Sequence, residues 1–276
     1  MTSKPIRAIV VGGTGYTGAE LVRLVLGHPS VELVSIVGNT TAGQAVADVL
    51  PSLRGIVDGV VQPFDPDAIT EQADVAFCAL PHAASAEAVS ALRQRGQKVF
   101  DLSADFRFED LSVYEAWYGK HLVPELLSEA VYGLVELHRE ELRTADLIAV
   151  PGCYPTASTL ALAPLVKNGL VLPDGIAVDA KSGVSGAGRG TSSATHFAET
   201  AEGVRAYKAG AHRHGPEIEQ ELSRLAGAPL QITFVPHLLP MTRGILATCY
   251  ARPADSNVTA AACTEAARAL QLLVTR

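Results

Sequence analysis

The 276-residue sequence has few cysteines, and they are scattered. The four cysteines include no Cys-x-x-Cys pair, which argues against a disulfide framework and against a zinc site, so no metal is expected. A reducing cytoplasm is the simplest compartment for such thiols. No apolar run approaches the roughly 18 residues that span a bilayer. The N-terminal apolar stretch gives way to glycines too early for a signal peptide.

Positive charge is also scarce. Lys and Arg number 22 against 29 Asp and Glu, a formal net charge of −7, and basic residues gather on no segment. This balance argues against nucleic acid as the main ligand. Charged residues make up 18% of the chain and hydrophobic residues 48%, which is ordinary for a globular protein of two domains or one large one. We therefore expect a small-molecule ligand, with neither a nucleic acid nor a membrane as partner.

Glycine is concentrated in the opening segment, IRAIVVGGTGYTGAELVRLVLGHP. The β-branched run 6–11 predicts a buried parallel strand, and the apolar spacing after the glycines predicts an amphipathic helix. Gly13, Gly15 and Gly18 fit the dinucleotide pattern GxGxxG, and Gly12 offers the overlapping GxxGxxG. The N-terminus of the helix would bind a pyrophosphate. A structural turn without a ligand is the alternative, but the second strand in VELVSIVG favours dinucleotide binding.

No acidic residue follows that second strand, between Gly38 and Gln44. NAD-binding folds commonly carry Asp or Glu there to bind the ribose hydroxyls. Asn39, Thr40 and Thr41 could instead hydrogen-bond the 2′-phosphate of NADP, although this segment contains no arginine. NADP(H) is therefore favoured over NAD(H).

Strands are predicted in DVAFCALPH, KVFDLSADFR and DLIAVPG, and a helix in SAEAVSALRQRG between the first two. Such alternation predicts an α/β fold, a Rossmann-type doubly wound parallel sheet that occupies residues 1–150. Ligands bind these sheets at the carboxyl ends of the strands. His82, residues 103–107 and Cys153 all fall at such ends.

The second half, residues 151–276, has a different pattern. GIAVDAKSGVSGAGRG, LQITFVPHLLP and RGILATCYARP predict longer strands with little helix between them. We expect an α+β catalytic and dimerisation domain with a mostly antiparallel sheet. Its segment SGVSGAGRGTSSATH contains four glycines and Arg189, which suits close backbone approach to an anion, with a flexible loop as the alternative.

His212 and His214 precede Pro216 and Glu217, a pair typical of a helix start. A zinc site built on His-x-His lacks further ligands at suitable spacing. An acid/base role for one of the two is better supported, and surface histidines are the alternative. Three other histidines lie in loop-like or charged surroundings and are expected at the surface: His28, His121 and His138.

Cys153 is set apart from the other cysteines, which lie inside apolar runs. In LIAVPGCYPTAS it is placed on a turn, just ahead of a helix whose first turn contains Pro155 and Thr156. A helix N-terminus and a nearby histidine favour the thiolate. Thiolate attack on an activated acyl group gives a thioester, which accepts hydride from NADPH. This set of residues fits a reductase of acyl phosphates to aldehydes, or the reverse reaction.

Together these motifs resemble the N-acetyl-gamma-glutamyl-phosphate reductase family of arginine biosynthesis. The resemblance covers essentially the whole chain, through the glycine segment and then ALPH, DLSADFR, YGLVEL, PGCYPT, SGVSGAGR, HRHGPEI and FVPHLLPMTRGI. It implies NADPH-dependent reduction of N-acetyl-L-glutamyl 5-phosphate to N-acetyl-L-glutamate 5-semialdehyde, with release of phosphate. We expect a cytoplasmic homo-oligomer, a dimer or a tetramer.

The resemblance also implies roles for particular residues. Cys153 would be the nucleophile and His214, alone or with His212, the acid/base. The acyl phosphate would be bound by Arg107, Arg189 and Glu217. The cofactor would be bound by Gly12, Gly13, Thr14, Gly15, Tyr16, Thr17, Gly18, Asn39, Thr40, His82, Ser185 and Gly186.

Three alternatives stay open at this point. A near relative in lysine biosynthesis keeps these motifs and acts on an amino-adipyl phosphate. A catalytically silent Rossmann-type binding protein and a dehydrogenase of free aldehydes are the other two. Members of the family continue beyond NVTAAACTEAARAL, so we expect this chain to be incomplete at its C-terminus. The open sheet edge beside RGILATCYARP would then make it poorly soluble and weakly active.

Overall fold

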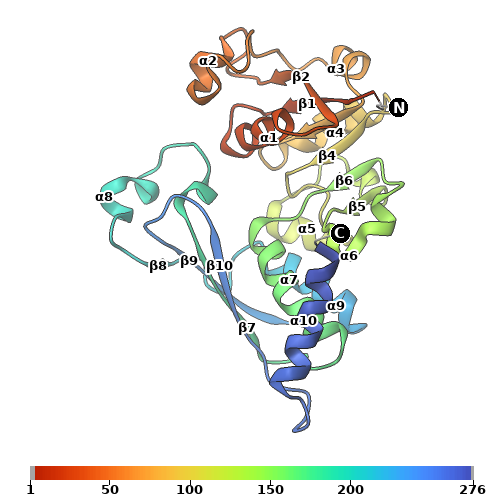
Figure 1. Cartoon of the computed structure of the whole chain (residues 1–276), viewed down its shortest axis with the longest axis vertical. Helices are drawn as coiled ribbons and strands as arrows, with labels where there is room; N and C mark the ends of the chain where they lie inside the picture. Colours follow the sequence, from red (N-terminus) through yellow and green to blue (C-terminus); the bar gives the residue numbers. More distant parts are fainter. Residues whose placement is uncertain (1–3, 275–276) are drawn as a thin grey trace. The chain divides into compact units, whose positions relative to one another are not determined.

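The computed structural model describes residues 4–274 (Figure 1). The chain divides into two compact units, each described separately below. The first contains the residues up to Gly133 together with His138–Val150. The second contains Leu134–Leu137 and the chain from Pro151 onward.

The first unit is built on a six-stranded sheet whose strand order is β2-β1-β3-β4-β6-β5, with every pairing parallel. Its strands are β1 (Ile6–Val11), β2 (Val31–Val37), β3 (Val75–Cys78), β4 (Lys98–Asp101), β5 (Ala130–Tyr132) and β6 (Leu147–Ala149). The order reverses between β1 and β3, which is the topological switch point of a doubly wound sheet. The predicted Rossmann-type fold is confirmed.

The first unit buries both faces of its sheet. Along β1, Ile9 and Val11 belong to one hydrophobic cluster, with Leu92, and Val10 belongs to another, with Val22. This is why the strand reads as a continuous apolar run. The helices are α1 (Tyr16–Leu26), α2 (Val46–Val49), α3 (Pro66–Gln72), α4 (Ala84–Arg93), α5 (Leu111–Tyr118) and α6 (Val135–Leu142), with short 3-10 turns η1 (Pro51–Leu53) and η2 (Pro124–Leu126). The residues of α6 up to Leu137 belong to the second unit.

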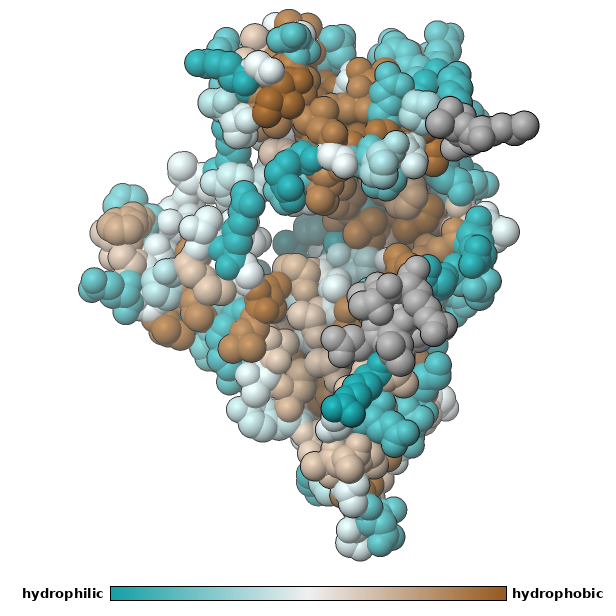
Figure 2. Space-filling view, in the orientation of Figure 1, coloured by the Kyte–Doolittle hydropathy of each residue, from teal (hydrophilic) through white to brown (hydrophobic). Residues whose placement is uncertain are grey.

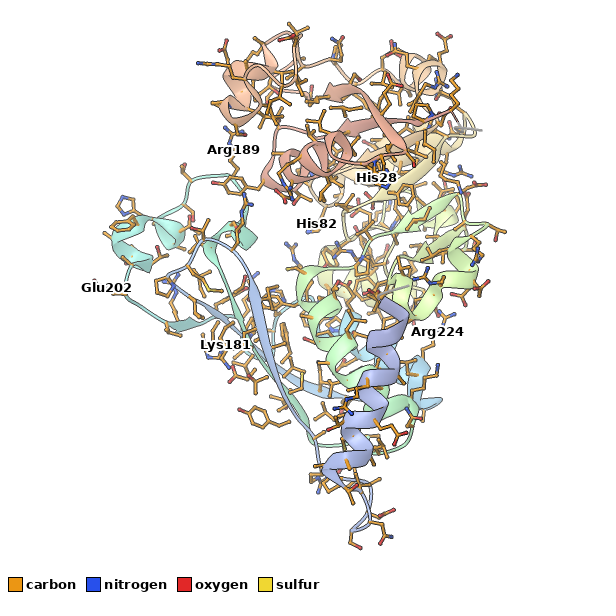
Figure 3. All side chains as sticks on the ribbon, in the orientation of Figure 1. His28, His82, Lys181, Arg189, Glu202 and Arg224 are labelled. Carbon is orange, nitrogen blue, oxygen red and sulfur yellow. The ribbon has the colours of Figure 1, made fainter. Side chains whose placement is uncertain are left out.

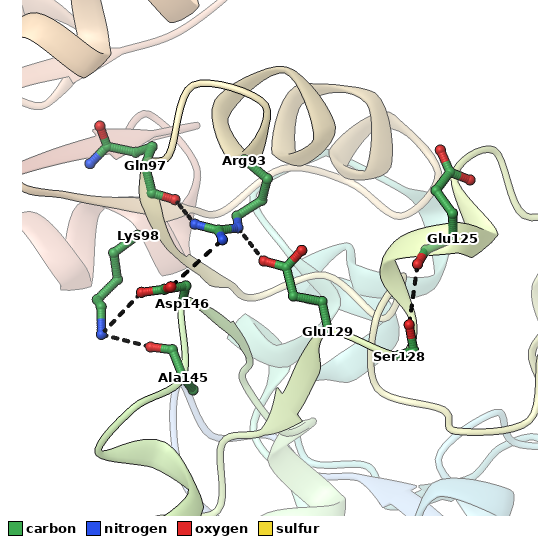
Figure 4. Close-up of polar contacts among 8 residues, drawn as sticks. All are labelled: Arg93, Gln97, Lys98, Glu125, Ser128, Glu129, Ala145 and Asp146. Carbon is green, nitrogen blue, oxygen red and sulfur yellow. Dashed lines mark hydrogen bonds and ion pairs between the residues drawn. The ribbon is translucent and has the colours of Figure 1, made fainter.

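An ionic network joins elements at the amino-terminal ends of the strands, opposite the edge where ligands bind (Figure 4). Arg93, at the end of α4, donates to a carboxylate oxygen of Glu129 and to the carbonyl of Gln97, each at 2.5 Å. Lys98, at the start of β4, donates to the carbonyl of Ala145 at 2.6 Å and lies 3.7 Å from Asp146. The network therefore fixes α4, β4 and the entry to β6 to one another.

Two histidines predicted at the surface are buried, which corrects that prediction. His121 is 3% exposed, and its Nδ1 accepts the N–H of Val123 while Nε2 lies 2.6 Å from the carbonyl oxygen of Asp105. His138 is 6% exposed and its Nδ1 lies 2.7 Å from Glu141. The polar surroundings in the sequence are the partners that make burial of these rings tolerable. His28 is exposed.

The second unit contains a four-stranded sheet of order β10-β7-β9-β8. The outer pairings are antiparallel and the central β7–β9 pairing is parallel, because α9 lies in the connection between those two strands. Its elements are α7 (Cys153–Lys167), β7 (Ile176–Ser182), η3 (Val184–Ala187), η4 (Ser193–Thr195), α8 (Phe197–Thr200), β8 (Arg205–Ala206), α9 (Gly215–Ala226), β9 (Ile232–Leu238), β10 (Ile245–Tyr250) and α10 (Ala260–Val274).

One face of this sheet carries the second core. Along β7, Ile176 and Val178 are buried against Leu162 of α7 and Ile218 of α9. The alternate residues of β7 and β10 point to the opposite face, where apolar surface lies over β10 (Figure 2). Leu246 and Tyr250 of β10 are 62% and 57% exposed. The strand β10 also forms an edge of the sheet.

Candidate active site

The glycine segment lies between β1 and α1. Gly12 has a φ of +78°, and a Cβ atom there would lie 2.5 Å from the carbonyl oxygen of Ala79. A Cβ at Gly18 would lie 2.3 Å from the Gly12 carbonyl oxygen. At Gly15, by contrast, the nearest heavy atom among the described residues would be 3.8 Å away. Packing therefore requires glycine at 12 and 18, whereas a glycine at 15 leaves the N-terminus of α1 open to a phosphate.

Gly15 is the N-cap of α1, and Tyr16, the first residue of the helix, is 48% exposed. Beyond β2, Asn39 and Thr40 are exposed. The hydroxyl of Thr41 is buried instead, so the expectation that Thr41 also reaches a 2′-phosphate is wrong. Asn39, Thr40 and Thr41 are all small polar residues, so the sequence does not distinguish them. The conformation of the turn determines which of their side chains are exposed.

The loop after β3 and the loop after β4 are hydrogen-bonded to each other. Nδ1 of His82 accepts the N–H of Ala104 at 2.9 Å, which leaves the ring proton of the neutral form on Nε2. Asp105 accepts the N–H groups of Ala83 and Ala86, at 2.9 and 3.0 Å, and so caps the start of α4. Ala83 has a φ of +67°, a strained value for a residue with a Cβ. His82 is therefore held in one orientation at the carboxyl edge of the sheet.

Asp101 and Arg107 are buried beneath the same loop and stabilise it through hydrogen bonds. Asp101 is fully buried and accepts hydroxyl protons from Ser85 and Ser103, each at 2.5 Å. Burial raises the pKa of Asp101 despite these two donors. Arg107 is 6% exposed and donates to the carbonyls of Val150 and Leu102, both at 2.8 Å. The motif DLSADFR therefore stabilises its own loop through these hydrogen bonds. This structural role was not predicted for Arg107, which was expected to contact the substrate.

Cys153 is the first residue of α7 and is exposed. The helix begins earlier than predicted because Gly152, in extended conformation, is the N-cap and its carbonyl accepts the N–H of Thr156 at 2.9 Å. Pro155 is compatible with this first turn because the N–H it lacks has no helical acceptor there. The thiol therefore lies at the positive end of the helix dipole, not on a turn ahead of it.

Glu217 supports the turn that carries Cys153. Its carboxylate is fully buried and accepts the N–H of Gly152 at 2.8 Å. Glu217 lies in the first turn of α9, whose N-cap is His214. This single hydrogen bond connects the N-termini of α7 and α9. A carboxylate with no exposed surface is better suited to holding this turn than to contacting substrate, and the substrate-binding role of Glu217 stays a prediction.

His212 and His214 lie in an aromatic cluster formed by Tyr154, Tyr207, His212, His214 and Phe234. The two histidine ring centroids are 4.8 Å apart, and the Tyr154 ring lies 5.7 Å from His212 and 5.9 Å from His214. The hydroxyls of Tyr154 and Tyr207 are 2.9 Å apart. Since Tyr154 directly follows Cys153, the cluster adjoins the thiol.

The members of the aromatic cluster differ in how burial shifts their pKa values. Burial, with the nearby charges of Lys208 and Arg213, lowers the pKa of His212 to about 4. Nδ1 of His212 accepts the N–H of His214 at 3.1 Å. Burial raises the pKa of both Tyr154 and Tyr207, so both hydroxyls stay protonated. His212 is neutral near pH 7 and holds the backbone of His214. Tyr154 and Tyr207 were not among the predicted site residues, although the position of Tyr154 directly after Cys153 was a usable signal.

The loop after β7 is anchored at its start. The N–H groups of Val184 and Ser185 donate to the carbonyls of Met241 and Thr242, at 2.9 and 3.0 Å. Gly186 and Arg189 follow and are exposed, with Arg189 on the connection toward α8 (Figure 3). Predicted site residues thus occur in both units. The glycine segment, Asn39, Thr40, His82 and Arg107 belong to the first, and Cys153, Ser185, Gly186, Arg189, His212, His214 and Glu217 to the second.

Within residues 4–274, no three His, Cys, Asp or Glu side chains are grouped so as to hold a metal ion. None of the described helices has the length and apolar character that crossing a membrane demands.

Two family models match the chain. Residues 7–145 match the semialdehyde dehydrogenase NAD binding domain, and residues 153–270 match the semialdehyde dehydrogenase dimerisation domain. The chain is 55% identical over 250 residues to an N-acetyl-gamma-glutamyl-phosphate reductase of Desulforudis audaxviator, covering 90% of this chain and 72% of that protein. It is 49% identical over 254 residues to the enzyme of the same name from Rhodopirellula baltica, covering 92% and 73%.

Solved structures of low sequence identity share the fold. An aspartate semialdehyde dehydrogenase II from Vibrio cholerae, complexed with ASA, matches with a TM-score of 0.69 at 15% identity, covering 96% of this chain and 79% of that one. An aspartate semialdehyde dehydrogenase with NADP from Candida albicans matches with a TM-score of 0.62 at 16% identity, covering 97% and 76%.

Proposed function

Because the chain belongs to the semialdehyde dehydrogenase family, as one of its N-acetyl-gamma-glutamyl-phosphate reductases, we propose that it reduces N-acetyl-L-glutamyl 5-phosphate to N-acetyl-L-glutamate 5-semialdehyde. The protein is an NADP-dependent oxidoreductase, and phosphate is the proposed second product. The main support within the chain is Cys153, an exposed thiol at a helix N-terminus whose N-cap residue, Gly152, is hydrogen-bonded to Glu217 in the first turn of the helix that begins at His214.

The first step is acyl transfer to Cys153. His214 accepts the thiol proton, and Sγ attacks the acyl carbon of the substrate. The bond from that carbon to the phosphate oxygen breaks, its electron pair leaves with phosphate, and a thioester remains on Sγ. His214 returns the proton to the departing phosphate. Arg189, exposed on its glycine-rich loop, is the proposed partner for the substrate's anionic groups, and Arg107, which already bonds two carbonyls, is the second candidate.

The second step reduces the thioester. NADPH, when bound, supplies the hydride that the carbonyl carbon accepts. The carbon–sulfur bond then breaks, the aldehyde leaves and Sγ keeps the electron pair. The chain fits this cofactor through the open helix N-terminus at Gly15 and through Asn39 and Thr40, where no carboxylate would repel a 2′-phosphate. We propose that His82, Ser185 and Gly186 add further contacts.

His212 has a supporting role in this scheme. With a pKa of about 4 its ring is neutral near pH 7 and too weakly basic to hold the second proton that a general acid would donate. Its Nδ1 instead fixes the backbone N–H of His214. We therefore assign the acid/base role to His214 and a positioning role to His212.

We propose that residues 1–150 bind the cofactor, that residues 151–276 bind the substrate, and that the protein works as a homo-oligomer in the cytoplasm. The family model over 153–270 is described as a dimerisation domain. The open face of the second sheet, with Leu246 and Tyr250 exposed on β10, suits such an interface. The four cysteines, which form no disulfide among the described residues, support a reducing compartment.

The proposal is tested by following NADPH absorbance with the purified chain and N-acetylglutamyl phosphate, with amino-adipyl phosphate in a parallel reaction. Cys153→Ser should keep less than ~1% of the wild-type kcat, because a serine hydroxyl forms no anion near neutral pH and an ester is a poorer hydride acceptor. NADPH binding, measured by fluorescence titration, should be unchanged. Cys263→Ser is the matched control and should keep full activity. A Cys153→Ser variant with a tenth of the wild-type rate would contradict the thioester.

A further inference from the structure

The groups that acyl transfer requires all belong to the second unit. Cys153, His214 and Glu217 lie there, whereas the glycine segment proposed to bind the cofactor lies in the first unit. The hydrogen bond from Gly152 to Glu217 fixes the nucleophile relative to the helix that His214 caps. No residue of this arrangement depends on a bound nicotinamide. The thioester can therefore form in the absence of the cofactor.

Water can reach the sulfur on which that thioester forms. Cys153 is exposed, whereas the next residue, Tyr154, is 2% exposed. His214 is partly exposed and its ring lies 5.9 Å from that of Tyr154, so it can take a proton from water as well as from a thiol. The acyl group on Cys153 thus has two possible acceptors, hydride or water.

We propose that the protein is also a cofactor-independent hydrolase of activated acyl compounds, an activity that rests on the proposed nucleophilic role of Cys153. Sγ attacks the acyl carbon, and the activated leaving group departs with its electron pair. Water then attacks the thioester carbon while His214 accepts one of its protons. The carbon–sulfur bond breaks, a carboxylic acid leaves and the thiolate is restored. Nothing is oxidised or reduced in this cycle.

The surroundings of the thiol restrict the substrates to those with good leaving groups. His212, with a pKa of about 4, is uncharged near neutral pH, and the tyrosine hydroxyls have raised pKa values. His214 is therefore the one member of the aromatic cluster assigned to proton transfer, and the proton it holds comes from the thiol. Leaving groups that are stable as anions, such as phosphate and nitrophenolate, depart readily, whereas amines and alkoxides are much poorer leaving groups and depend on that single proton.

The experiment uses the full chain without NADPH and p-nitrophenyl acetate as the probe. We expect a stoichiometric burst of nitrophenolate followed by steady turnover, with a steady rate at least ~10-fold above that of Cys153→Ser. Cys263→Ser should match the wild type, and p-nitroacetanilide, the amide analogue, should not be cleaved. A steady rate that Cys153→Ser retains would place the hydrolysis elsewhere and overturn the proposal.

A reductase assay on the same preparation separates this activity from the proposed function. Cys153-dependent reduction together with a burst but no turnover would mean that water does not reach the thioester, which overturns the hydrolase and leaves the reductase intact. With N-acetylglutamyl phosphate as the probe, added NADPH should lower the yield of N-acetylglutamate and raise the yield of aldehyde by the same amount. An acid yield that NADPH leaves unchanged would show that the two products share no intermediate, and would also overturn the proposal.

Discussion

At the scale of single residues, His212 shows how burial sets a protonation state. Its ring packs against Tyr154 and Phe234, with centroids 5.7 and 5.4 Å away, and its Nδ1 accepts a backbone N–H. Burial and two neighbouring cations lower its pKa from 6.5 to about 4. The folded protein therefore prefers the neutral ring, while the unfolded chain takes up a proton at a higher pH.

This difference predicts a pH dependence of stability. The contribution of His212 is complete above the ordinary pKa of 6.5 and is lost as pH falls toward about 4, because only the unfolded chain binds the proton in that window. The ring is partly exposed, so we expect a loss on the order of 1 kcal/mol. His212→Asn, which keeps an acceptor for the N–H of His214, should remove this slope in urea unfolding measured between about pH 7 and about pH 5. His28→Asn, at an exposed position, should retain the slope. Equal slopes in wild type and His212→Asn would contradict the assignment.

Asn39 is the second residue whose substitution tests a local charge. It is exposed just beyond β2, and no acidic residue occurs between Gly38 and Gln44. Asn39→Asp should repel the 2′-phosphate and lower kcat/KM for NADPH by about tenfold while changing the value for NADH much less. Asn257→Asp, the same change on an exposed loop of the second unit, should alter neither value. Equal losses for both cofactors would show that this turn does not face the ribose.

At the scale of elements, the pair α7 and α9 organises the nucleophile. Both helices begin at a site residue or beside one, since Gly152 caps α7 and His214 caps α9. Glu217 connects the two N-termini through the N–H of Gly152. Glu217 is also the acidic residue in the first turn of α9, the end at which the helix dipole favours acidic side chains.

Removing this connection should affect both folding and catalysis. Glu217→Ala leaves a buried N–H without its acceptor, so we expect a loss of about 1–3 kcal/mol in the free energy of unfolding. The turn that presents Cys153 would also shift, and kcat should fall at least ~10-fold with little change in NADPH affinity. Glu217→Gln keeps an acceptor oxygen and should recover most of the stability. If Gln and Ala destabilise equally, the hydrogen bond to Gly152 is not what Glu217 contributes.

At the scale of the whole molecule, the two sheets differ in how they are covered. The first sheet is buried on both faces, whereas in the second α7 and α9 cover one face and β10 presents Leu246 and Tyr250 on the other. A solvent-facing row of this kind suits association with a second copy. Edge strands with unpaired backbone groups are also prone to non-specific pairing.

A charge on the open face should therefore change the assembly. Leu246→Lys should shift the molar mass, measured by light scattering over a range of concentrations, toward that of the monomer. NADPH binding should be unaffected, because the substitution lies outside the first unit. Leu24→Lys, on α1 and 54% exposed, is the control and should leave the mass unchanged. If both variants keep the wild-type mass, the interface lies elsewhere.

The features of this protein that depend on neighbouring residues can be predicted from local sequence pattern. The β-branched run of β1, the glycines that follow it and the alternation of strands and helices predict the parallel sheet, because strand burial and turn conformation depend on adjacent residues. Cys153 was also evident, since a cysteine at a glycine–proline turn departs from the apolar setting of the other three.

The tertiary structure alone decided which polar side chains have partners inside the protein. Gly152 and Glu217 are 65 residues apart, and Asp105 and Ala83 are 22 apart, so neither bond is visible in a local pattern. His121 and His138 read as surface residues because the sequence shows their polarity but not the partners that satisfy it. A buried polar group is tolerated only with a correctly placed partner, and the fold places that partner.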